Sequence, residues 1–82
     1  AKARILIVDD ERLIRWTLKE KLAGAGHAVC TAETGEEAFD LLAEEPAEVV
    51  LLDNRLPGMD GIDALRLIRD TDPTVQVVMV TA

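Results

Sequence analysis

Several features that would mark a secreted or membrane protein are missing from this chain of 82 residues. Its single cysteine, Cys30, excludes an internal disulfide framework, and we expect it to be a small buried strand residue. No apolar run is long enough to span a bilayer, and the amino terminus lacks the apolar core of a signal peptide. We therefore expect a cytoplasmic location and no membrane partner.

Basic residues are also scarce, because nine Lys and Arg stand against sixteen Asp and Glu, for a net charge of −7. Nucleic acid backbones need clusters of Lys and Arg, so we expect no direct nucleic acid binding by this segment. The acidic excess instead suits cation binding. There is no internal repeat, linker or low-complexity tract, and the length allows one domain of thin stability, since a short chain buries a modest fraction of its surface.

Apolar runs alternate with amphipathic segments along the chain. We predict strands at residues 4–8, 27–31, 49–53 and 75–80. Between them we predict three helices, at about 11–23, from a Thr34–Glu37 capping box to about 44, and at about 62–70. A tight turn at Pro57-Gly58 leads to the third helix, with Asp60 as its cap. Strand and helix in alternation predict a parallel sheet with right-handed crossovers. The residues expected to face the sheet from the first and third helices are Ile14, Leu18, Leu22, Ile62, Leu65 and Ile68.

Acidic residues stand at the carboxyl ends of two predicted strands. Asp53 ends the run Val49–Leu52, and Asp9 and Asp10 follow the run Ile5–Val8. Open α/β sheets place their reactive groups at this edge, so the pair of acidic strand ends suggests a site for a divalent cation and a phosphoryl group. The alternatives are structural: Asp53 as a turn residue, and Asp9 or Asp10 as a cap of the following helix, since acids favour helix amino termini.

Three motifs together resemble the receiver domain of bacterial two-component response regulators. They are Ile-Val-Asp-Asp-Glu at 7–11, Leu-Asp-Asn-Arg-Leu-Pro-Gly-Met-Asp-Gly at 52–61 and Val-Met-Val-Thr-Ala at 78–82, and the resemblance covers the whole chain. The Ile14-Arg15-Trp16 stretch and the loop at 56–61 look most like the nitrogen-regulator class. The resemblance implies a flavodoxin-like (CheY-like) α/β fold with a doubly wound parallel sheet, its strands ordered 2-1-3-4 by their sequence in the chain.

The resemblance also implies a role for each site residue. Asp53 matches the phosphoacceptor, whose carboxylate would attack a phosphoryl group and hold it as an acyl phosphate. Mg²⁺ would be held by Asp10, Asp53 and the backbone carbonyl of Asn54, with Asp9 acting mostly through water. Thr81 matches the hydroxyl that bonds a phosphoryl oxygen after transfer.

By the same resemblance, the donor would be a sensor histidine kinase, the output a process such as transcription, and the chain a signalling domain and not an enzyme. Receivers normally continue with a fourth helix, a fifth strand bearing a Lys and a fifth helix, which have no match in residues 1–82. We therefore expect a receiver truncated after its fourth strand. Its apolar last strand and uncovered sheet face would favour a homodimer or other assembly.

Three alternatives remain open. A structural or assembly fragment would keep the site residues without completing the phosphorylation switch. A haloacid-dehalogenase-like phosphatase would need an Asp-x-Asp pair after the first strand, but the spacing of Asp9, Asp10 and Glu11 is wrong for it. A flavodoxin-like flavin binder would need a loop rich in glycine and hydroxyls there, whereas these acids would repel a phosphate unless a metal intervened.

Overall fold

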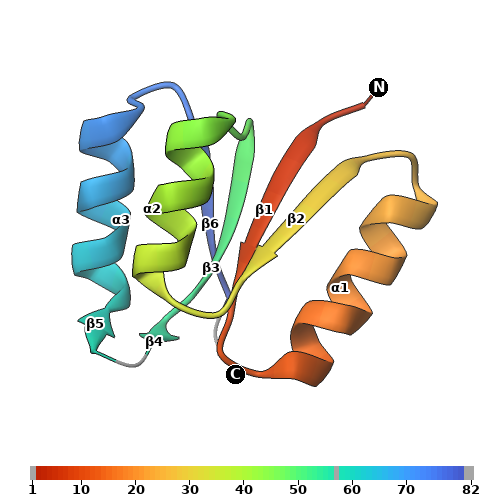
Figure 1. The fold of residues 1–82 in the computed structure, drawn as a ribbon, viewed down its shortest axis with the longest axis horizontal. Helices are drawn as coiled ribbons and strands as arrows, with labels where there is room; N and C mark the ends of the chain where they lie inside the picture. The colour runs from red at the N-terminus through yellow and green to blue at the C-terminus, as the bar shows by residue number, and fades with distance from the viewer. Residues whose placement is uncertain (1, 57, 81–82) are drawn as a thin grey trace.

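A parallel sheet of four strands organises the chain, as shown by a computed structural model that describes residues 2–56 and 58–80 (Figure 1). The strands are β1 (Arg4–Val8), β2 (Ala28–Ala32), β3 (Val49–Asp53) and β6 (Gln76–Val80). Their order is β2-β1-β3-β6, and every adjacent pair is parallel. Since β6 is the fourth strand of this sheet along the chain, the predicted order 2-1-3-4 and the doubly wound α/β fold are confirmed.

Helices cover both faces of the sheet. Two of them, α2 (Gly35–Glu44) and α3 (Gly61–Thr71), lie side by side on one face, and α1 (Arg12–Gly24) lies on the other (Figure 1). The predicted capping residues start α2 and α3, since Thr34 Oγ1 accepts from Glu37 N at 3.1 Å and Asp60 Oδ1 accepts from Ile62 N at 2.8 Å. No helix within residues 2–56 and 58–80 is long and apolar enough to cross a membrane.

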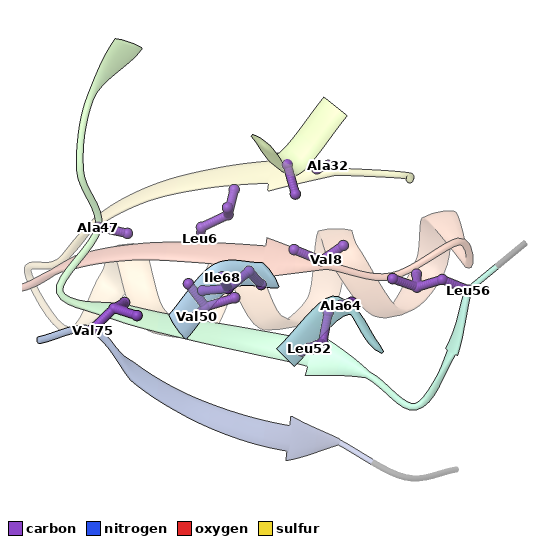
Figure 2. Close-up of a cluster of buried hydrophobic side chains, with 11 residues drawn as sticks. Leu6, Val8, Ala32, Ala47, Val50, Leu52, Leu56, Ala64, Ile68 and Val75 are labelled. Atoms are coloured by element: carbon purple, nitrogen blue, oxygen red, sulfur yellow. The ribbon is translucent and has the colours of Figure 1, made fainter. Parts of the chain in front are cut away.

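The core lies between the sheet and the α2–α3 pair (Figure 2). Alternate residues of a strand point to opposite faces, and β1 and β3 are apolar on both, as strands covered on two sides require. Small residues on the helices, Ala38 and Ala64, allow close approach to the sheet. The residues buried in this cluster include Leu6, Val8, Ala32, Val50, Leu52, Ala64, Ile68 and, just before β6, Val75.

Two burial predictions are wrong. Ile62 is 48% exposed, because α3 meets the sheet through Gly61, Ala64 and Ile68, whereas Leu65 and Ile68 face the core as predicted. Cys30 is exposed rather than buried. Cys30 lies on β2, an end strand of the sheet, and pairs with Leu6 of β1. The helix packing that buries Leu6 does not extend over Cys30.

A short antiparallel hairpin between β3 and α3 was not predicted. Its strands are β4 (Arg55–Leu56) and β5 (Met59–Asp60). The turn expected at Pro57-Gly58 is consistent with Gly58, whose φ of +73° favours glycine, while Pro57 lies outside the described residues. The hairpin buries Leu56 in the core and delivers Asp60 to the start of α3.

Candidate metal centre

Three aspartates meet at the carboxyl ends of β1 and β3. Asp9 and Asp10 follow β1, and Asp53 is the last residue of β3. These strands are parallel neighbours, with Val8 opposite Leu52, so the residues that follow each of them come together. One carboxylate oxygen from each aspartate lies within 4.8 Å of the other two. Sequence reasoning placed these side chains at one edge of the sheet, and the structure brings them together there.

Short loops fix the orientation of two of these carboxylates. Asp9 is only 4% exposed, and its Oδ1 accepts a hydrogen bond from Glu11 N at 2.8 Å. Half-buried Asp53 follows the same pattern, with its Oδ1 accepting from Arg55 N at 3.0 Å. Such bonds to the backbone two residues on are typical Asx turns. They use one oxygen of each carboxylate and leave the other for a cation, while Asp10 is exposed to solvent.

The electrostatics of the cluster oppose its own ionisation. Burial raises the pKa of Asp9 above its usual 3.8, the hydrogen bond from Glu11 N acts in the opposite direction, and the charges of Asp53, Asp10 and Glu11 raise it further. Carboxylates this close repel one another. A divalent cation would relieve the repulsion, and carboxylate oxygens are the hard ligands that Mg²⁺ takes in proteins.

Arg15 supports this edge and was missed as a site residue by sequence reasoning. From α1, its Nη1 donates to the backbone oxygen of Asp9 at 2.7 Å, and its Nη2 lies 3.3 Å from Glu33 Oε1. The side chain is 12% exposed. Arg15 thereby ties the loop after β1 to the loop after β2. Its place one helical turn after Glu11 was a signal available in the sequence, but only the fold shows which carbonyl it reaches.

Asn54, the residue expected to offer a backbone carbonyl, is held between two elements. Its N–H donates to Val80 O of β6 at 3.3 Å. On its other side lies Gly61, the buried first residue of α3. Thr81, expected to bond the phosphoryl group, lies outside the described residues, and its role stays a prediction.

Carboxylates cluster at the ends of the central strands of a doubly wound parallel sheet. This arrangement is that of an α/β domain of the CheY-like class. The response regulator receiver domain family matches residues 5–82, and the chain therefore belongs to that family, which is part of two-component signalling. The family inferred from the three motifs is confirmed.

Similar proteins place the chain near the nitrogen-regulator class. It is 42% identical over 78 residues to the DNA-binding transcriptional regulator NtrC of Escherichia coli K12, covering 95% of this chain and 17% of that protein. Among solved structures, NtrX from Brucella abortus in complex with ADP superposes with a TM-score of 0.95 at 34% identity, over 99% of this chain and 19% of that one. The response regulator TrrA from Thermotoga maritima, in complex with Mg²⁺ and BeF, gives 0.91 at 39% identity, over 98% and 70%.

Proposed function

We propose that this receiver accepts a phosphoryl group on the carboxylate of Asp53 from a sensor histidine kinase. The main support for this proposal is that one carboxylate oxygen each of Asp9, Asp10 and Asp53 lies within 4.8 Å of the other two at the edge of the sheet. In the transfer, a carboxylate oxygen of Asp53 forms a bond to phosphorus, the phosphorus–nitrogen bond to the kinase histidine breaks, and the imidazole leaves. The hydrogen bond from Arg55 N fixes the carboxylate for that attack.

The same proposal includes a magnesium ion. Carboxylates of Asp10 and Asp53 and the carbonyl of Asn54 would hold it, with Asp9 acting through water. The donor set fits, because it consists of clustered hard oxygens, and the pKa of Asp9 is raised by burial and further by the neighbouring carboxylates. When bound, Mg²⁺ offsets the repulsion between carboxylate and phosphoryl oxygens. The Mg²⁺–BeF complex of TrrA, 39% identical to this chain, supports the assignment.

Partners and output are part of the proposal. We infer that Thr81 bonds a phosphoryl oxygen after transfer, that the chain acts as a signalling domain in the cytoplasm, and that its phosphorylation regulates transcription. The support is the likeness to NtrC, a DNA-binding transcriptional regulator of which the chain covers 17%. The described strands share one core with α2 and α3, and α1 packs on β1 and β2 of the same sheet, which supports a single receiver domain. The alternative of a structural fragment has no support from the similar proteins.

We also propose that the chain of residues 1–82 self-associates. Among residues 2–56 and 58–80, α1 packs on β1 and β2, whereas Val78 of β6 on the same face is 49% exposed. The β6 segment Gln76–Val80 carries no charge and pairs within the described sheet only with β3. Apolar uncharged edges of this kind invite pairing with another chain.

A labelling experiment tests the phosphoacceptor. The chain is incubated with acetyl phosphate, with Mg²⁺ or with EDTA, and the intact mass is measured for the wild type and Asp53→Asn. The Asn side chain keeps an oxygen to accept from Arg55 N, so the fold should be spared. We expect one phosphoryl increment on the wild type with Mg²⁺ and none on Asp53→Asn. Full labelling of the variant would place the acceptor on another residue.

A further inference from the structure

The start of α3 is packed against the residue that follows the phosphoacceptor. Gly61 is buried, and a Cβ built on it would lie 2.9 Å from Asn54 Cα and 3.0 Å from both Asn54 O and Asn54 Oδ1. A distance below 3.0 Å is essentially never seen for a real Cβ atom, and two of the three contacts are to backbone. Any side chain at position 61 must therefore push the start of α3 and the backbone of Asn54 apart.

Glycine is required at this position for space and not for conformation. Among the described residues, the glycines with positive φ are Gly26 and Gly58, so the backbone of Gly61 is one that alanine can adopt. Alanine also has a higher helix propensity than glycine. The close approach to Asn54 is then the feature that distinguishes glycine from alanine at the first residue of α3.

The backbone of Asn54 is part of one turn with the site. Asp53 Oδ1 accepts from Arg55 N at 3.0 Å, and Asn54 N donates to Val80 O at 3.3 Å. Residues 53–55 are thus fixed by β6 on one side and by Gly61 on the other. A shift of Asn54 would move its carbonyl oxygen together with Arg55 N, the donor that orients the Asp53 carboxylate.

We propose that Gly61 is a positioning residue for the metal site, because it lets α3 begin in contact with Asn54 and so fixes the Asn54 carbonyl oxygen. This inference rests on the proposed function, in which that oxygen is a ligand of Mg²⁺. Gly61 touches neither the metal nor the phosphoryl group in this role. It acts only through the backbone of Asn54.

Two other glycines provide matched controls. Gly24, the last residue of α1, has no atom within 4 Å of an added Cβ. At Gly35, the first residue of α2, an added Cβ meets Met59 Sδ at 2.8 Å, which is a flexible side chain that can move away. The same change from glycine to alanine therefore meets open space at position 24, a flexible side chain at position 35 and the backbone of Asn54 at position 61. Asp60→Ala adds a further control, since it loosens the start of α3 by removing its cap without adding an atom near Asn54.

The experiment compares the wild type with G61A, G24A, G35A and D60A. Mg²⁺ affinity is measured by isothermal titration calorimetry and the unfolding midpoint by circular dichroism. Metal-free amide shifts of Asn54 and Arg55 are measured by NMR. We expect G61A to lose Mg²⁺ affinity by about tenfold or more, in the range seen when a residue that orients a ligand is changed. It should also shift both amides without metal, while the three controls keep the wild-type affinity.

Several results would overturn the inference. Mg²⁺ affinity in G61A equal to that in G24A, or metal-free amide shifts that do not move, would show that Gly61 does not position Asn54. An equal loss in G61A and D60A would assign the effect to general loosening of α3. If G61A is too unstable to titrate, all five proteins are compared in trimethylamine N-oxide, which favours the folded state. A wild type that binds no Mg²⁺ overturns the proposed metal site as well. If the wild type binds Mg²⁺ and G61A binds it equally well, only the inference about Gly61 is overturned.

Discussion

Asp9 shows how a side chain can be favourable for a site and unfavourable for the fold. It is buried beside two other carboxylates, and burial is the main reason that its pKa rises above 3.8. In the folded chain it therefore keeps its proton at pH values where the unfolded chain has already released it. Stability contributed by protonated Asp9 is fully present below 3.8 and is lost as pH rises through the folded pKa.

Replacing Asp9 by asparagine should remove this penalty. The asparagine side chain would keep an oxygen to accept from Glu11 N and would carry no charge among its neighbours. In EDTA at neutral pH, we expect Asp9→Asn to have a higher free energy of unfolding than the wild type. Below pH 3.8 the difference should vanish, because Asp9 is then neutral in both states. Urea unfolding at both pH values checks this, and a variant less stable than the wild type at neutral pH would contradict it.

Asp9 and Asp10 should differ in their effect on Mg²⁺. Asp10 is exposed and free to turn toward a cation, whereas one oxygen of Asp9 is used by Glu11 N. We expect Asp9→Asn to weaken Mg²⁺ binding by about tenfold, as for a residue that acts through an intervening water. Asp10→Asn, which removes a direct ligand, should weaken it more. Calorimetric titrations of the two variants give the comparison, and equal or inverted losses would refute the ligand assignment.

Sequence reasoning located the acidic residues of the site but not the residues that hold them. Asp9, Asp10 and Asp53 were predictable because strand ends of a parallel sheet meet at one edge. Arg15 instead donates to the backbone oxygen of Asp9 at 2.7 Å, and Gly61 packs against the backbone of Asn54. Unlike the helix caps, these two contacts have no characteristic spacing of residue types, so they emerge only from the packed structure.

Among the elements, those with a long apolar run or a cap were predicted best. The bounds of β1 and β3 agree with the prediction, and α2 and α3 start at the predicted caps, Thr34 and Asp60. The β4–β5 hairpin was missed because strands of two residues are too short to show alternation. On α3 the inward positions of Leu65 and Ile68 were predicted correctly, whereas Ile62 was wrong and the buried Gly61 and Ala64 were missed, since they carry little hydropathy and their burial reflects close packing.

Truncating two isoleucines of α3, both predicted to face the sheet, distinguishes the buried one from the exposed one. Ile68 is 1% exposed and packs in the core, so Ile68→Ala should lower the free energy of unfolding by about 2–5 kcal/mol. Ile62 is 48% exposed, and Ile62→Ala should cost less than about 1 kcal/mol. Both are measured by urea denaturation. Similar losses for the two variants would mean that α3 is rotated relative to the sheet.

Across the whole molecule, the two faces of the sheet are covered unequally. The α2–α3 face carries a continuous core (Figure 2). Val77 and Met79 of β6 are partly buried and pack against it. On the opposite face α1 packs on β1 and β2 (Figure 1). Among the described residues, Val78 of β6 is half exposed on that face. Apolar area on a strand at the end of the sheet favours association. The net charge of −7 opposes it, and salt screens that repulsion.

Self-association of the chain of residues 1–82 is therefore expected to strengthen with salt and to depend on β6. Val78→Lys puts a charge on the edge strand, a device that blocks strand pairing. Leu13→Lys makes the same change in charge at a residue of α1 that is 72% exposed, away from β6. In sedimentation velocity at micromolar concentration, we expect the wild type and Leu13→Lys to form dimers and Val78→Lys to be monomeric. A wild type that stays monomeric at high salt would rule out this surface as an interface, and dimers of Val78→Lys would place the interface on another element.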